Sequence, residues 1–144
     1  MIPRKKQPVK IGQAEGIHIG PSNFLLKKDL HIYFDGLEFI IKKGYPTDGA
    51  SIPFFLEPIG GNRFSGDVLS PAIFHDMMYE SETYSRHCAD NNFLFLMRKN
   101  GVGWWKRSIF WLMVRIFGWL SQLRHTVGSV ENARQYLQIK KKML

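Results

Sequence analysis

Residues 30–41 read LHIYFDGLEFII, two apolar runs of five residues joined by Asp35-Gly36. An Asp-Gly pair between such runs is typical of a two-residue hairpin turn, because the turn needs positive φ angles that these residues accept. The stretch therefore predicts an antiparallel β-hairpin. Phe24–Leu26 can form a further short strand before it, whereas residues 1–20 are predicted to form a basic arm.

The hairpin is followed by a long irregular segment, GYPTDGASIPFFLEP at residues 44–58, which continues into Gly60-Gly61-Asn62. Its three prolines and two glycines disfavour regular structure. A loop of this length in a small domain is usually functional or disordered. Its apolar side chains disfavour disorder, so residues 21–62 are expected to form strands and an ordered loop.

Helical signals dominate the rest of the chain. Ser70 is a suitable N-cap with Pro71 at the first helical position, and Gly101 is a suitable stop. Farther on, apolar residues recur every three or four positions, which is the helical period. The expected helices span residues 71–80, 84–100, 104–123 and 130 to about 142.

Together these elements predict one α+β domain over residues 1–144, with an N-terminal hairpin or small antiparallel sheet followed by three to four helices. Its helical core is expected over 69–123, and a basic C-terminal helix over 129–144. The one cysteine, Cys88, excludes an intramolecular disulfide. The N-terminus does not resemble a signal peptide, and the uncharged stretches 108–114 and 116–123 are too short to span a membrane.

The chain has a formal net charge of +8, and the excess positive charge lies in its last third. Residues 98–144 contain ten Lys or Arg and one acidic residue, Glu131, a net charge of +9. This asymmetry predicts contact with something anionic: nucleic acid, the lipid headgroups of a membrane surface, or an acidic partner such as another phage or host protein. No helix-turn-helix, zinc-finger or stacking-sheet motif indicates sequence-specific nucleic-acid binding.

A polar cluster is predicted within residues 72–101, AIFHDMMYESETYSRHCADNNFLFLMRKNG. His75, Asp76 and Tyr79 fall within one helical turn and project near one another. A short connection makes the next helix an antiparallel neighbour, which can return Asp90 to His75. A His oriented by a carboxylate suits a general base, and Asp76 would then be free to bind a cation.

The spacing Ala72-x-x-His75-Asp76-x-x-Tyr79, followed by Ala89-Asp90-x-x-Phe93, resembles the catalytic helix pair of phospholipase A2 enzymes, particularly the disulfide-free kind of parvovirus capsid proteins. The resemblance implies that His75 activates water and Asp90 orients His75, with Tyr79 in the same catalytic cluster. It also implies a Ca²⁺ site, whose oxygen ligands would come from Asp76, Gly60 and Asn62.

A second resemblance covers roughly residues 30–120. The ordered motifs Thr47-Asp48-Gly49-Ala50-Ser51-Ile52-Pro53, His75-Asp76-x-x-Tyr79, Arg86 and Ala89-Asp90 are similar to a domain-of-unknown-function family common in tailed phages and prophages. It implies a phage-related origin and location in the host cytoplasm or the virion. It also adds Asp48, Ser51 and Arg86 to the polar set expected to converge.

The same residues have other interpretations. His75 could be satisfied inside a structural network in which Arg86 pairs with Asp76 or Asp90, because buried polar groups need partners whether or not they catalyse. Ser51 lacks the Gly-x-Ser-x-Gly elbow of a nucleophile. A metal-dependent phosphohydrolase also uses a His-Asp doublet, but that class is all-helical, and here strands and a loop precede the doublet.

The segment 104–123 combines tryptophans with basic residues, which is typical of a helix lying in a membrane interface. The favoured alternative is that it packs on the hairpin as core, with Trp105 and Ile109 inward, because a small domain needs that apolar area. Two functions follow from the whole sequence. One is a phage-encoded His/Asp-dependent hydrolase of ester bonds; the other is a non-catalytic virion, tail or host-factor-binding protein.

Overall fold

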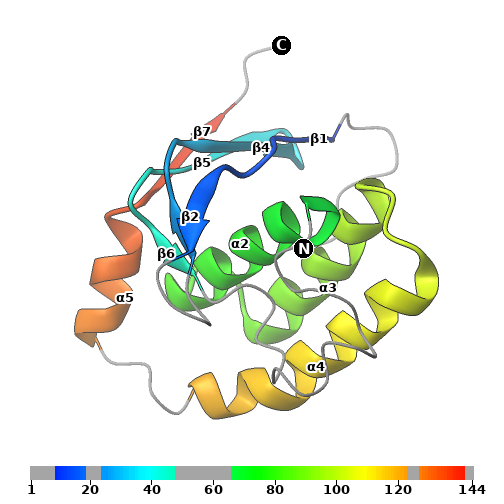
Figure 1. The fold of residues 1–144 in the computed structure, drawn as a ribbon. Helices are drawn as coiled ribbons and strands as arrows, with labels where there is room; N and C mark the ends of the chain where they lie inside the picture. Colours follow the sequence, from blue (N-terminus) through cyan, green and yellow to red (C-terminus); the bar gives the residue numbers. More distant parts are fainter. Residues whose placement is uncertain (1–8, 19–23, 48–65, 123–126, 142–144) are drawn as a thin grey trace.

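The computed structural model describes residues 9–18, 24–47, 66–122 and 127–141, with backbone only for 18, 47, 66, 117–122 and 127–128. In the described chain every strand but the last precedes the helices, and the predicted α+β class is confirmed (Figure 1). Residues 10–11 and 16–18, which were expected in a basic arm, form the strands β1 (Lys10–Ile11) and β2 (Gly16–His18).

The predicted hairpin is confirmed, with β4 (Leu30–Phe34) pairing antiparallel to β5 (Leu37–Ile41). Phe34 lies opposite Leu37, and the two turn residues, Asp35 and Gly36, have φ angles of 55° and 74°. Both are positive, as a tight turn of the right twist requires. β1 adds to the outer edge of β4, which gives the sheet order β1-β4-β5-β7.

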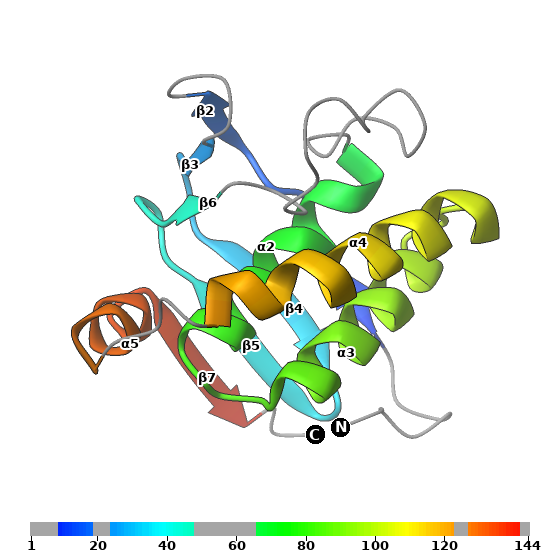
Figure 2. The ribbon, with the colours of Figure 1, turned by 90° about the horizontal axis from the view of Figure 1, so that it is seen from below.

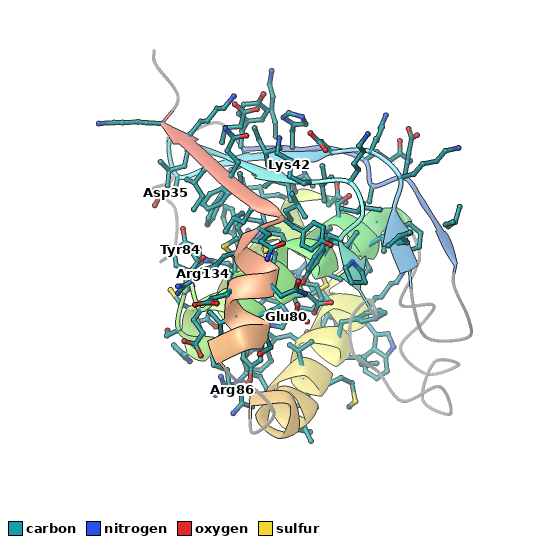
Figure 3. All side chains as sticks on the ribbon, turned by 90° about the vertical axis from the view of Figure 1, so that its left-hand side faces the viewer. Asp35, Lys42, Glu80, Tyr84, Arg86 and Arg134 are labelled. Atoms are coloured by element: carbon teal, nitrogen blue, oxygen red, sulfur yellow. The ribbon has the colours of Figure 1, made fainter. Side chains whose placement is uncertain are left out.

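The fourth strand of this sheet corrects the prediction of a C-terminal helix over 129–144. Helix α5 (Val127–Arg134) ends early, and the chain then forms β7 (Leu137–Lys141), which runs from α5 along β5 (Figure 3). The open edge of β5 offers backbone hydrogen bonds to this segment, and such tertiary pairing overrides local helix propensity. A smaller antiparallel sheet joins β2 with β3 (Phe24–Leu26) and β6 (Pro46–Thr47).

Three helices lie in succession below the main sheet: α2 (Gly66–Glu80), α3 (Arg86–Lys99) and α4 (Trp104–Gln122). α2 and α3 lie between the sheet and α4, which occupies the opposite end of the molecule (Figures 1 and 2). α2 is therefore the central helix, and its described residues from Val68 to Tyr79 are all buried. A central helix can hold polar groups only if they are paired.

The apolar core has two parts. The first packs the sheet against α2 and α3, with Phe34, Phe39 and Phe74 in mutual edge or tilted ring contact. The second joins α2, α3 and α4 through Phe93, Phe110 and their neighbours. α4 thus contributes to the second part, and the prediction that it packs on the hairpin is wrong.

The start of α2 also differs from the prediction. The helix begins at Gly66, so Pro71 lies inside it, and the Ser70 hydroxyl accepts a hydrogen bond from the Ala14 amide instead of capping. Pro71 has no N–H for the carbonyl of Asp67, four residues earlier. The side-chain amide of Asn100 supplies that hydrogen bond at 2.8 Å. A contact from α3 therefore makes a proline acceptable in α2.

Candidate functional site

The centre of the candidate site is His75 on α2. Its ring stacks on Tyr79 with centroids 5.9 Å apart and planes at 12°, and it also meets Phe93 of α3 at 5.1 Å. The predicted proximity of His75 and Tyr79 is confirmed. Because the two aromatic rings border the imidazole, they restrict how it can turn.

Asp90 lies at the Nε2 edge of the His75 ring. Ser85 caps the start of α3, and the antiparallel course of this helix returns Asp90 to α2 as the sequence predicts. His75 Nε2 and Asp90 Oδ1 are 2.6 Å apart, the distance of a short, charge-assisted hydrogen bond. The two side chains are 7% and 1% exposed. Such a pair fixes both the plane of the imidazole and the nitrogen that faces away from the carboxylate.

Arg115 of α4 binds the second oxygen of the same carboxylate. Its Nη1 donates to Asp90 Oδ2 at 3.0 Å. Arg86 lies at the start of α3 (Figure 3), and its guanidinium donates to the backbone carbonyl of Arg115. Arg86 thus bonds α4 instead of pairing with Asp76 or Asp90 as the structural alternative predicted. Asp90 is held between a cation from α2 and a cation from α4.

Sequence reasoning did not include Arg115 in the site. The available signal was that it is the one charge splitting the apolar stretches 108–114 and 116–123. A lone charge on a core-facing segment needs a buried partner. Its distance from Asp90 along the chain hides that partner until α4 is packed on α3.

Asp76 lies near the remaining nitrogen of His75. Its Oδ1 is 3.6 Å from His75 Nδ1, too far for a hydrogen bond but close enough for charge attraction, and its side chain is 10% exposed. Burial alone would lower the pKa of His75, but the carboxylates of Asp76 and Asp90 outweigh burial and raise it from 6.5 to about 9. At neutral pH the ring is therefore an imidazolium between two carboxylates.

The remaining candidate residues lie outside the described part of the chain: Asp48, Ser51, Gly60 and Asn62. Within the described residues, no group of three or more His, Cys, Asp and Glu side chains is placed to hold a metal ion. A Ca²⁺ site built from Asp76, Gly60 and Asn62 therefore stays a prediction.

Residues 25–114 match the family described as "Protein of unknown function (DUF1353)". The chain belongs to the DUF1353 family. The matched span contains the hairpin and His75, Asp76 and Asp90, and it ends one residue before Arg115. The central part of the site thus lies within the region shared with the family.

The DUF1353 chain is also similar to the "Uncharacterized protein y4jT" of Sinorhizobium fredii (strain NBRC 101917 / NGR234). The two are 34% identical over 84 residues, which is 58% of this chain and 25% of the relative. The chain thus matches about a quarter of the length of that relative. No solved structure matches this chain.

Proposed function

We propose that this DUF1353 protein is a hydrolase of ester bonds in which His75 is the general base. The observation that carries the proposal is the 2.6 Å contact between His75 Nε2 and Asp90 Oδ1, reinforced by Arg115 on Asp90 Oδ2. A base oriented by a fixed carboxylate is the recurring arrangement for activating a nucleophile. The resemblance to the phospholipase A2 helix pair supports the same roles.

The proposed reaction uses His75 Nδ1, because Nε2 is occupied by Asp90. Nδ1 takes a proton from water, and the resulting hydroxide attacks the carbonyl carbon of the ester. The imidazolium then returns the proton to the departing alkoxide, so that acid and alcohol are released. Tyr79 acts as a positioning residue, since it contacts the ring by stacking.

The pKa of His75 sets the pH at which the base is available. Because this pKa is about 9, the neutral ring is the minor form at pH 7. The rate of base catalysis should therefore increase with pH until about pH 9, where the neutral form becomes abundant.

The test is ester hydrolysis by the full chain on phospholipid vesicles and on soluble chromogenic esters. His75→Gln should reduce turnover by about 100-fold or more, the usual contribution of a general base. Glu15→Gln is the matched control, because Glu15 pairs with Lys28 on the surface. This variant should hydrolyse the esters at the wild-type rate. Hydrolysis that survives in the His75→Gln protein rules out the proposed role.

A second candidate function is supported by the burial of the cluster. His75, Asp76 and Asp90 are all buried, and their charges are mutually compensated. This arrangement also fits a non-catalytic phage protein, a virion or tail component or a binder of a host factor, in which the cluster is scaffold. Ester hydrolysis separates the two, because both functions predict that His75→Ala lowers the unfolding midpoint. A scaffold role predicts that wild type hydrolyses none of the esters.

A further inference from the structure

The outward face of α4 carries an unusual concentration of exposed apolar side chains. Six large hydrophobic residues of the described chain are exposed, and four of them lie on α4. Their exposed fractions are 67% for Trp104, 61% for Trp105, 47% for Leu112 and 50% for Ile116. Monomeric proteins rarely gather such side chains on one surface without a partner for it.

These residues form one stripe along the helix. Trp105, Leu112 and Ile116 follow the helical repeat, and Trp104 extends the stripe by an edge-to-face contact with Trp105 at 6.0 Å. The opposite face, with Phe110 and Val114, is the one buried against α2 and α3. The side chains of the stripe therefore do not pack in the core. It corrects the prediction that Trp105 points inward.

Positive charge gathers where the stripe begins. Arg98 and Lys99 end α3 and are exposed, and Arg107 follows the two tryptophans. In the described chain, Arg107 Nη1 donates to the Val102 carbonyl, and Lys99 Nζ lies over the Phe95 ring at 5.6 Å. Neither contact neutralises charge. Lys106 and Arg115, by contrast, pair with Asp67 and Asp90.

We propose that the outward face of α4 binds an anionic lipid surface. Tryptophans and aliphatic residues on one face, with Lys and Arg beside them, are the composition of helices that lie in the headgroup region. No helix within the described part of the chain is both long and apolar enough to cross a membrane, so the helix would lie along the bilayer. Arg98, Lys99 and Arg107, which lie where the stripe begins, supply the attraction to anionic headgroups.

The charge distribution favours lipid over a second copy of the chain. A symmetric contact through this stripe would bring Arg98, Lys99 and Arg107 of both copies together, and like charges at an interface oppose association. The proposal goes beyond the hydrolase function and does not require it. Binding can be measured with the His75→Gln protein, so failure of one proposal leaves the other standing.

The experiment is sedimentation of the full-length chain with vesicles of phosphatidylcholine alone or with an equal amount of phosphatidylglycerol. Wild type and His75→Gln should both bind the anionic vesicles, and added salt should weaken binding. Trp105→Ser and Leu112→Gln should each weaken it about tenfold, because each removes a large apolar side chain from the contact. Ile139→Gln is the matched control, since Ile139 on β7 is 42% exposed but lies on another face.

Three results would overturn the proposal. One is equal binding by wild type and the α4 variants, and another is equal binding to neutral and anionic vesicles. The third is a dimer that dissociates in Trp105→Ser while wild type ignores vesicles, which would assign the stripe to a second copy. Circular dichroism of each variant checks that α4 stays helical. We expect it to do so, because the substituted side chains are exposed.

Discussion

Charges of alternating sign run through the middle of the molecule, from Arg115 to Asp90, His75 and Asp76. The positions of His75, Asp76 and Tyr79 could be predicted because one helical turn relates them. Asp90 could be predicted because a short connection forces α3 to run back along α2. Arg115 could not, since its contact depends on how α4 docks, which no local spacing encodes.

Asp90 is the residue on which the cluster depends most. Asp90→Asn leaves the buried imidazolium of His75 and the guanidinium of Arg115 without their shared anion. Removing one partner of a buried charge pair typically costs about 3 kcal/mol or more, so we expect the free energy of unfolding to fall by about that amount at pH 7. Urea unfolding measures it, and Glu15→Gln, at an exposed pair, should change little. A loss for Asp90→Asn no larger than for Glu15→Gln would contradict the role of Asp90.

The raised pKa of His75 makes stability depend on pH. Below pH 6.5 both folded and unfolded chains are protonated at His75, and its contribution is complete. Between pH 6.5 and about 9 only the folded chain keeps the proton, so the contribution is lost as pH rises. The difference between the pKa of His75 in the unfolded chain, 6.5, and in the folded chain, about 9, corresponds to about 3 kcal/mol of stability, at roughly 1.4 kcal/mol per pKa unit.

The pH effect is measured as the difference in unfolding free energy between wild type and His75→Gln across this range. The extra unfolding free energy of wild type over His75→Gln should disappear by about pH 9. Asp76→Asn should move the loss to lower pH, because it removes one of the two carboxylates that raise the pKa. A constant difference from pH 6 to 10 would show that His75 is not charged in the folded chain.

At the scale of elements, turn and stop signals were reliable where the deciding contacts are local. The Asp35-Gly36 turn, the stop at Gly101 and the end of α4 near residue 122 agree with the sequence. The failures are elements that depend on distant partners. β7 forms because β5 has an open edge, and α2 extends past Pro71 because Asn100 reaches the carbonyl of Asp67.

The contact between Asn100 and α2 can be tested directly. Asn100→Ala removes the hydrogen bond to the Asp67 carbonyl, which Pro71 cannot replace. We expect the free energy of unfolding to fall by about 1 kcal/mol, the usual net value of such a bond. Asn132→Ala on α5 is the control, because Asn132 is exposed on a helix and should lose nothing. Equal effects of the two substitutions would mean that the contact contributes no stability.

At the scale of the whole molecule, the packing of the layers decides which face of α4 is buried and which is exposed. The sequence alone could not assign these two faces. The concentration of positive charge in the last third was visible from composition alone. Which face of 104–123 is buried was not, because both faces of this helix are apolar. The second core selects Phe110 and Val114, and that choice leaves the tryptophans on the surface.

The central claim is that His75 and Asp90 act as one catalytic unit. The most direct test is a double-substitution cycle of kcat for ester hydrolysis, with His75→Gln, Asp90→Asn and the two combined. If Asp90 acts only through His75, the double variant should be no slower than His75→Gln alone, because groups that act as a unit are strongly non-additive. Independent, multiplying losses would contradict the claim, as would a wild-type chain that hydrolyses none of the esters.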